Sequence, residues 1–219
     1  MIKSSLFAAG LMSMVVSSAS ADVIVIAGWS MPTAVAASTQ GATYSYGEAN
    51  SGARASGSGL RGDHIGAATT WSSPSGNGST YALSSNAWSV GDYYQISLNT
   101  IGYSGVSVAW EQTRSSTGPA GFEAVLSVDG GTTFSSLGSY TVNQVSWSAT
   151  VPVTTSSFGY LASAADNSIG IIIRFKVVTA GTSPSGTNRI DNIVVSGVIP
   201  APGAVALIGL AGLVSRRRR

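Results

Sequence analysis

The sequence predicts an all-β protein, a single jelly-roll-like antiparallel β-sandwich, and three observations support this prediction. Apolar and polar residues alternate with a period of two in several segments, which is the pattern of strands that bury one face. Turns rich in Gly, Ser and Pro separate these segments at short spacing. Between residues 22 and 198 no segment has the apolar period of a helix, so we expect helices only in the two terminal segments.

Residues 1–21 have the features of a secretory signal peptide. Lys3 precedes an apolar stretch, and the small residues Ala19 and Ala21 form a cleavage pattern before Asp22. We therefore expect an N-terminal signal helix at 1–21 that signal peptidase removes. The exported mature chain would then begin at Asp22.

The first strand is expected at Val23–Ala27, a continuous apolar run that is β-branched at every position but the last. The polar stretch 31–86 that follows is too long for a single loop in a compact domain, so we expect short edge strands at Ala42–Tyr46 and Ser79–Leu83. The same stretch contains Arg61-Gly62-Asp63, which spells the integrin-binding tripeptide. Three residues without structural context carry little information, so we interpret this match as chance.

The clearest strand patterns lie in the middle and at the end of the chain. Ser115–Gly121 is expected to form the turn of a hairpin between two of these strands, and a further strand is expected from 145 to 149, around Trp147. Together with the earlier segments this predicts eight to ten strands in one domain, from 22 to 198. The segments with the clearest alternation are 93–98, 106–111, 122–128, 169–177 and 189–195.

Ser127–Phe134 is predicted to form a tight hairpin. Gly130 and Gly131 supply the positive φ that the turn requires. The segment also matches the Asp-box pattern S-x-D-x-G-x-T-F, which is generally a structural hairpin in β-proteins. We therefore expect Asp129 to have no part in catalysis.

The tail from 199 to 219 joins a Pro-rich hinge, an apolar segment and a basic cluster. The apolar run Ala204–Val214 has 11 residues. As a helix it spans roughly 16 Å, against about 30 Å for the hydrocarbon core of a bilayer, so this short C-terminal hydrophobic helix is a poor permanent anchor. The charge bias of membrane insertion would keep the basic cluster on the cytoplasmic side and the body outside. The cluster consists of Arg216, Arg217, Arg218 and Arg219.

This order of segments resembles the PEP-CTERM sorting signal of bacterial surface proteins. The motif of that family corresponds here to Pro200, Ala201, Pro202 and Gly203, without the glutamate. The resemblance implies an exosortase-like processing enzyme as a partner and transient contact with the membrane through the tail. It also implies a place at the cell envelope or cell surface, with release to the extracellular matrix as an alternative.

A second resemblance covers roughly residues 71 to 219. The segments Ser85–Gln95, Glu111–Pro119 and Arg189–Asn192, together with the hairpin at Asp129, look like the β-sandwich body common among PEP-CTERM surface proteins. The resemblance implies a jelly-roll shape that is shared with carbohydrate-binding modules. It brings no reaction with it.

The charge of the body differs from that of the whole chain. The chain has 11 basic and 9 acidic residues, but Lys3 and the four C-terminal arginines lie in the terminal segments, which leaves 6 basic against 9 acidic residues. A net charge of −3 gives no support to binding of nucleic acid. The chain has no cysteine, so the fold depends on its core rather than on disulfides.

Few residues of the chain are candidates for a catalytic site. A multi-histidine metal site is excluded because His64 is the single histidine, and no serine lies in a nucleophile elbow that would favour a triad through it. The better candidates are Glu111 and Glu123, which would face one another if their strands formed a hairpin. Two carboxyl groups about 5–5.5 Å apart would predict a retaining glycosidase. This is the alternative to a non-catalytic protein.

The preferred prediction is a non-catalytic surface or matrix protein that binds extracellular polysaccharide. Aromatic side chains outside the clearest core positions are typical of such binding surfaces. The jelly-roll resemblance also implies a structural calcium ion near the last strand, with Asp191 as the matching position. A purely structural surface protein without a ligand is a third alternative. The predicted ligand contacts are Trp71, Tyr81, Trp88, Tyr93 and Tyr103.

Overall fold

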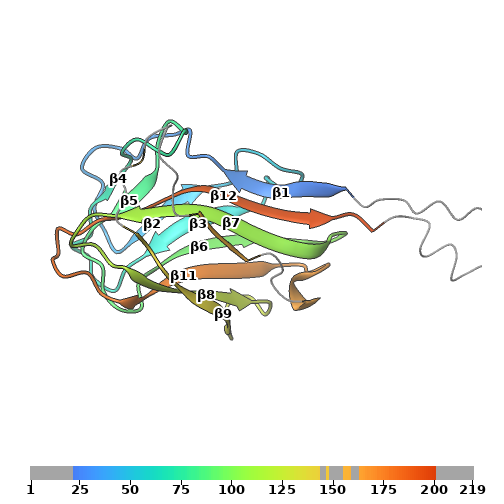
Figure 1. Ribbon diagram of the computed structural model, residues 1–219. Coiled ribbons are helices and arrows are strands. Elements are labelled where there is room, and N and C mark those ends of the chain that lie inside the picture. The colour runs from blue at the N-terminus through green and yellow to red at the C-terminus, as the bar shows by residue number, and fades with distance from the viewer. Residues whose placement is uncertain (1–21, 144–146, 148–154, 159–162, 201–219) are drawn as a thin grey trace, which may run out of the picture. The chain divides into compact units, whose positions relative to one another are not determined.

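The computed structural model describes residues 22–143, 147, 155–158 and 163–200. Asp22–Pro200 forms one compact unit, built from two antiparallel sheets that lie face to face (Figure 1). Among the described residues the helical structure is limited to the short 3-10 turn η1 (Ser163–Ala165). The predicted all-β sandwich is therefore confirmed.

Each sheet has six strands. The first sheet has the order β10-β7-β12-β5-β4, with β1 paired to β12 beside this path, and the second has the order β2-β3-β6-β11-β8-β9. The strands of the first sheet are β1 (Val23–Trp29), β4 (Trp71–Ser72), β5 (Leu83–Ser85), β7 (Ser104–Arg114), β10 (Thr155–Phe158) and β12 (Asn188–Val198). Those of the second sheet are β2 (Thr43–Gly47), β3 (Gly59–Asp63), β6 (Tyr93–Leu98), β8 (Gly121–Ser127), β9 (Ser135–Thr141) and β11 (Ile171–Thr179).

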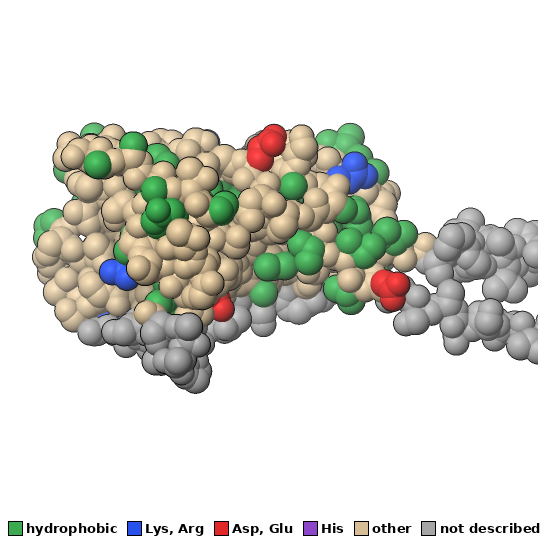
Figure 2. Space-filling view, turned by 90° about the horizontal axis from the view of Figure 1, so that it is seen from above, with side chains coloured by type: hydrophobic (Ala, Val, Ile, Leu, Met, Phe, Trp, Pro, Cys, Tyr) green, Lys and Arg blue, Asp and Glu red, His purple; other side chains and the backbone are tan. Residues whose placement is uncertain are grey.

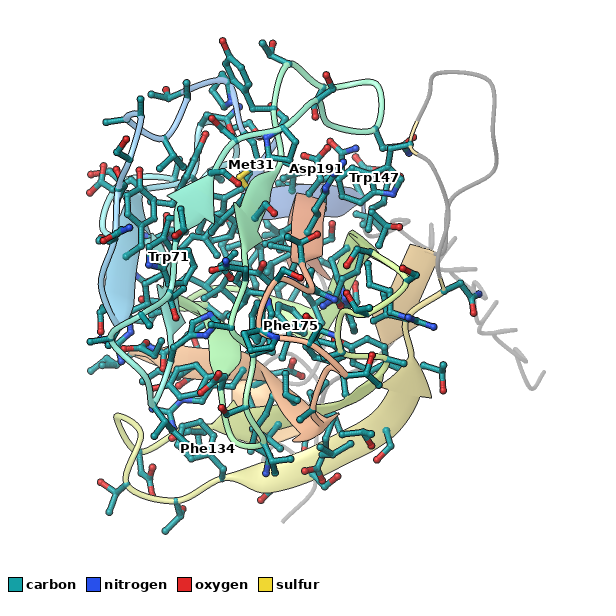
Figure 3. The ribbon with its side chains drawn as sticks, turned by 90° about the vertical axis from the view of Figure 1, so that its left-hand side faces the viewer. Met31, Trp71, Phe134, Trp147, Phe175 and Asp191 are labelled. Carbon is teal, nitrogen blue, oxygen red and sulfur yellow. The ribbon has the colours of Figure 1, made fainter. Side chains whose placement is uncertain are left out.

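The core lies between the two sheets. Phe175 of β11 lies near its centre, and its ring is 4.3 Å from that of Trp110 on β7 in the opposite sheet (Figure 3). Burial of a large apolar side chain contributes about 2–3 kcal/mol, so a core of this kind can stabilise a chain without disulfides. The largest fully buried side chains include Trp29, Trp71, Trp110, Tyr94, Phe122 and Phe175.

Several connections cross from one sheet to the other, which agrees with the predicted jelly-roll-like arrangement. β5 leads to β6, β7 to β8 and β11 to β12, and in each case the two strands belong to different sheets. The hairpin predicted at Ser115–Gly121 is therefore wrong. β7 pairs with β12 and β10, whereas β8 pairs with β11 and β9, so the segment 115–120 carries the chain between the sheets.

The strands predicted from alternation are present, but weaker ones were missed. The strand predicted at Ser79–Leu83 is wrong except for its last residue, because the strand in this region, β5, begins only at Leu83. The missed strands are β3, β4, β9 and β10. β9 lies at an edge of its sheet with mostly exposed or half-buried residues, which explains its weak apolar pattern. Most of the strand predicted at 145–149 lies outside the described residues.

The tripeptide Arg61-Gly62-Asp63 forms part of β3. The side chain of Arg61 points to that of Asp63, with Nε 2.8 Å from Oδ2. Gly62 lies on the inner face, where the ring of Trp71 occupies the space that a Cβ would need. The glycine is thus required by core packing, and the two charged residues pair with one another.

The surface of the body is poor in charge. Charged residues make up 9% of the sequence, and in the view of Figure 2 they are few and scattered among uncharged polar side chains and backbone. Strong electrostatic attraction of a ligand therefore depends on individual side chains rather than on a broad charged patch on this face.

The predicted signal helix at 1–21 and the part of the predicted tail from 201 to 219 lie outside the described residues. β1 and β12 are neighbours, with Val23 opposite Val198, so the first and last strands of the body lie side by side. Within the described ranges no helix has the length and apolarity needed to cross a bilayer.

Candidate functional site

The outer face of the second sheet presents a row of polar and aromatic side chains from its two central strands. β6 and β11 are antiparallel neighbours, and Gln95 lies directly opposite Arg174. Tyr94 and Phe175 point into the core, so the alternation of a strand turns Tyr93, Gln95 and Arg174 outward. These residues are brought together from positions about 80 apart in sequence.

The guanidinium group of Arg174 contacts two aromatic rings. Its Cζ lies 4.2 Å from the ring centre of Tyr93 and 4.1 Å from that of Phe134. Nε donates a hydrogen bond to Oε1 of Gln95 at 2.8 Å. Cation–π contacts and this hydrogen bond fix the plane of the group, and they leave Nη1 and Nη2 as its open edge.

The Asp-box hairpin positions Phe134. Asp129 Oδ1 accepts hydrogen bonds from the backbone N–H groups of Thr132 and Thr133, both at 3.0 Å, and the Ser127 hydroxyl donates to the same oxygen at 2.7 Å. The hydroxyl and backbone N–H of Thr133, with Ser127 next, hold the pKa of Asp129 well below its ordinary value. The predicted structural hairpin is therefore confirmed, and it turns the chain so that Phe134 reaches Arg174.

A hollow continues the same face beyond Gln95 and Arg174. It has a volume of about 270 Å³, and its floor includes Ser97 and Ile172, which lie two residues further along β6 and β11. One side is formed by Gly130 of the Asp-box hairpin. The remaining lining residues are Gly57, Leu98, Asn99, Ile169, Gly170 and Ile171. We use the name β6–β11 face for the surface formed by Tyr93, Gln95, Ser97, Phe134, Ile172 and Arg174.

Two other basic side chains on the outer face of the second sheet have carboxylate partners. Arg61 pairs with Asp63 on β3, and Lys176 Nζ lies 3.0 Å from Glu123 Oε2. A hydrogen bond from Ser136 and the ion pair with Lys176 lower the pKa of Glu123. Among the described residues no carboxylate lies within ion-pair distance of Arg174.

The predicted glycosidase pair is wrong. Trp110 and Phe122 are both buried between the sheets, so the next residue on each strand, Glu111 and Glu123, points away from the core. Glu111 belongs to the first sheet and Glu123 to the second. The two carboxyl groups therefore lie on opposite outer faces of the sandwich and cannot act on one glycosidic bond.

Asp191 does not fit the predicted calcium site. Its Oδ1 accepts a hydrogen bond from the backbone N–H of Asn192 at 2.7 Å, and its Oδ2 accepts from that of Asn77 at 2.8 Å and from the hydroxyl of Ser79. Glu111 accepts from the side-chain amides of Asn77 and Asn192 at 2.9 and 2.6 Å. Burial raises the pKa of Asp191, and the charge of Glu111 adds to this rise.

Calcium needs six to eight oxygen ligands, but here N–H donors face the carboxylate oxygens. The described part of the chain has no group of three or more His, Cys, Asp and Glu side chains that could hold a metal ion. The two carboxylates instead tie the loop that contains Asn77 and Ser79 to β12 and β7.

His64, the single histidine of the sequence, is buried. Its Nδ1 lies 3.0 Å from Asp92 Oδ2 and its Nε2 lies 3.1 Å from Ser85 Oγ. The order Ser–His–Asp is that of a hydrolase triad, but Ser85 is only 1% exposed, so a substrate has no approach to its hydroxyl. The three residues form a buried polar network, with the ring of His64 next to those of Trp71 and Trp88.

The predicted aromatic contacts divide into two groups. Trp71, Trp88 and Tyr103 are wrong as surface contacts, because they are buried with exposed fractions of 1%, 6% and 7%. Tyr81 is partly buried against the core. Tyr93 alone of the five lies on the β6–β11 face.

A second hollow, of about 310 Å³, lies beside Trp88. It is lined by Ala87, Trp88, Ser89, Gly181, Thr182, Ser183 and Pro184. The indole of Trp88 donates to the carbonyl of Ser85 and packs against Tyr94, so little of its ring is open to a ligand. This hollow lacks the half-buried aromatic rings that the β6–β11 face offers, Tyr93 and Phe134.

No protein-family model matches the chain, and no curated protein matches it. The solved structures that resemble this chain do so at low identity and with TM-scores below 0.5. The CBM22-1 xylan-binding domain of Xyn10C from Paenibacillus barcinonensis has a TM-score of 0.43 and 10% identity, over 84% of this chain and 99% of that one. The K1 cleaved adhesin domain of Lys-gingipain from Porphyromonas gingivalis has a TM-score of 0.43 and 10% identity, over 80% and 97%. TmCBM61, solved with β-1,4-galactotriose, has a TM-score of 0.41 and 12% identity, over 64% and 88%.

Proposed function

We propose that this chain is an exported, non-catalytic surface protein that binds extracellular polysaccharide on its β6–β11 face. The observation that carries the proposal is the fixed group of Tyr93, Phe134, Gln95 and Arg174 beside a hollow on the open face of a sheet. Aromatic rings pack against the apolar faces of sugar rings, and the guanidinium group hydrogen-bonds their hydroxyls. Gln95 is only 7% exposed, and its part is to hold Arg174 in place. Side chains already held in place lose little conformational entropy on binding.

The shape of this face suits an extended ligand. The side chains follow β6 and β11 from Tyr93 to Ser97 and from Arg174 to Ile172, and the hollow continues the same line. Successive residues on one face of a strand lie about 7 Å apart, so the row spans at least two sugar units. Export and sorting to the envelope by the tail complete the proposal, and they rest on the sequence of the two terminal segments.

A glycan array with the purified protein tests the binding, followed by affinities for any retained glycan. We expect Tyr93→Ala to weaken binding at least tenfold, about 1.4 kcal/mol. Tyr81→Ala is the matched control, because Tyr81 lies on the loop beside the first sheet, and it should leave the affinity unchanged. A protein that retains no glycan would have a purely structural surface role, and equal losses in both variants would place the site elsewhere.

A further inference from the structure

The basic side chains on the outer face of the second sheet differ in whether a carboxylate lies beside them. Arg61 and Lys176 each have a carboxylate partner, Asp63 and Glu123, at 2.8 and 3.0 Å. Arg174 lies between these two pairs on the central strand, and in the described chain its contacts are two aromatic rings and a neutral amide. The face therefore presents one cation whose charge no neighbouring side chain neutralises.

The contacts of Arg174 also restrict the direction from which a ligand can reach it. The ring centres of Tyr93 and Phe134 lie 4.2 and 4.1 Å from Cζ, and Nε is already hydrogen-bonded to Gln95. Nη1 and Nη2 remain available to a ligand, and they donate hydrogen bonds within the plane of the guanidinium group. A planar carboxylate matches two such donors in a bidentate pair, and the charge makes these bonds stronger than those to a hydroxyl.

We infer that the β6–β11 face selects polysaccharides that carry carboxylate groups, such as uronic acid polymers, and that Arg174 is the residue that binds the carboxylate. This inference rests on the proposed function and names its ligand class. The neighbouring acidic groups do not oppose it strongly. Asp129 and Glu48 lie near the hollow, but their carboxylates accept hydrogen bonds from backbone N–H groups of Thr132, Thr133 and Gly57.

The body as a whole has more acidic than basic residues, so long-range attraction does not bring an anionic polymer to it. Selection must come from the short-range pair at Arg174. A single charge-assisted pair predicts a preference that is moderate in size and sensitive to salt, because the site lies at the surface.

The test compares two polymers with one backbone, polygalacturonate and its fully methyl-esterified form, by titration calorimetry with the purified full chain. We expect the acid form to bind about tenfold more tightly at low salt, and the preference to shrink as salt is raised to 1 M. Equal affinity for the two polymers, with loss of both in Tyr93→Ala, would overturn the inference and leave the proposed function standing. Binding of neither polymer, nor of any array glycan, would overturn both.

Variants of Arg174 assign the residue. Arg174→Gln should remove the preference for the acid form, and Arg174→Lys should keep only part of it, because lysine lacks the planar pair of donors. Arg189→Gln is the control for charge, since Arg189 lies on β12 in the first sheet, whereas the β6–β11 face belongs to the second sheet. A circular dichroism spectrum confirms that each variant folds. If folded Arg174→Gln keeps the tenfold preference, Arg174 does not select the carboxylate.

Discussion

At the scale of the residue, the buried pair of His64 and Asp92 shows how polar groups are kept inside an apolar core. Burial alone would raise the pKa of Asp92, but hydrogen bonds from His64 and from the backbone of Ser89 and Ile65 lower it below 3.8. A carboxyl whose pKa is lower in the folded state stabilises the fold above about pH 4. That contribution is lost as the pH falls through the folded pKa.

The prediction is that Asp92→Asn destabilises the protein at pH 7 by roughly 1–3 kcal/mol, because buried donors lose a charged acceptor. Its free energy of unfolding should also fall less than that of the wild type between pH 5 and pH 2. Urea unfolding at several pH values measures both effects. Asp22→Asn removes the same charge at an exposed position, and it should behave as the wild type does. Parallel pH profiles for wild type and Asp92→Asn would contradict the assignment.

At the scale of the element, β3 depends on one glycine. A Cβ at Gly62 would collide with the ring of Trp71, which is fully buried and hydrogen-bonded through Nε1 to the carbonyl of Gly41 at 2.8 Å. Gly62→Ala should therefore cost about 1–3 kcal/mol of stability through overpacking. Gly59→Ala on the same strand meets only the hydroxyl of Ser97 at 3.1 Å, and its cost should be much smaller. Thermal unfolding of both variants measures this difference in stability, and equal melting temperatures would refute the steric explanation.

The elements also show what the sequence could predict. Strands with one buried face, such as β6, β7 and β11, can be predicted from the sequence, because burial of one face requires apolar residues at alternate positions. β3 does not, because its inward residues are Leu60 and a glycine. The sequence also does not show to which of the two sheets each strand belongs. The connection at 115–120 has the composition of a hairpin turn, yet it crosses between sheets, and this single error placed Glu111 beside Glu123.

The candidate site was predictable only in part. The sequence places Tyr93 among the aromatic residues outside the clearest core positions. Arg174 lies in the alternating segment 169–177, between the buried Ile173 and Phe175, which is the pattern of an outward side chain. The sequence could not show that Phe134 and Tyr93 both contact that guanidinium. The three residues meet through the register of β6 and β11 and through the path of the Asp-box hairpin. Conversely, Trp71 and Trp88 are packed in the core beside His64. Their neighbours in sequence are short polar residues, so no apolar pattern indicated that they are buried.

At the scale of the whole molecule, the described body is a compact unit of its own. The compact unit ends at Pro200, and the last strand, β12, ends at Val198, where it pairs with the first residue of β1. The strands of the described body therefore all lie before Pro200. A truncation after Pro200 should change the free energy of unfolding by less than about 0.5 kcal/mol, as expected for changes away from the core and its hydrogen bonds.

The same truncation tests the predicted sorting role of the tail. If the apolar run Ala204–Val214 and the arginines that follow it hold the chain at the envelope, deletion of 201–219 should move most of the protein from the envelope fraction to the soluble exported fraction. Replacement of Arg216–Arg219 by glutamine, which keeps the apolar run, should give an intermediate result because it removes only the charge bias. Cell fractionation with an antibody against the body measures the distribution. A truncated protein that stays with the envelope as firmly as the full chain would show that the tail is not the sorting element, and the β6–β11 face would then be the first surface to test for attachment.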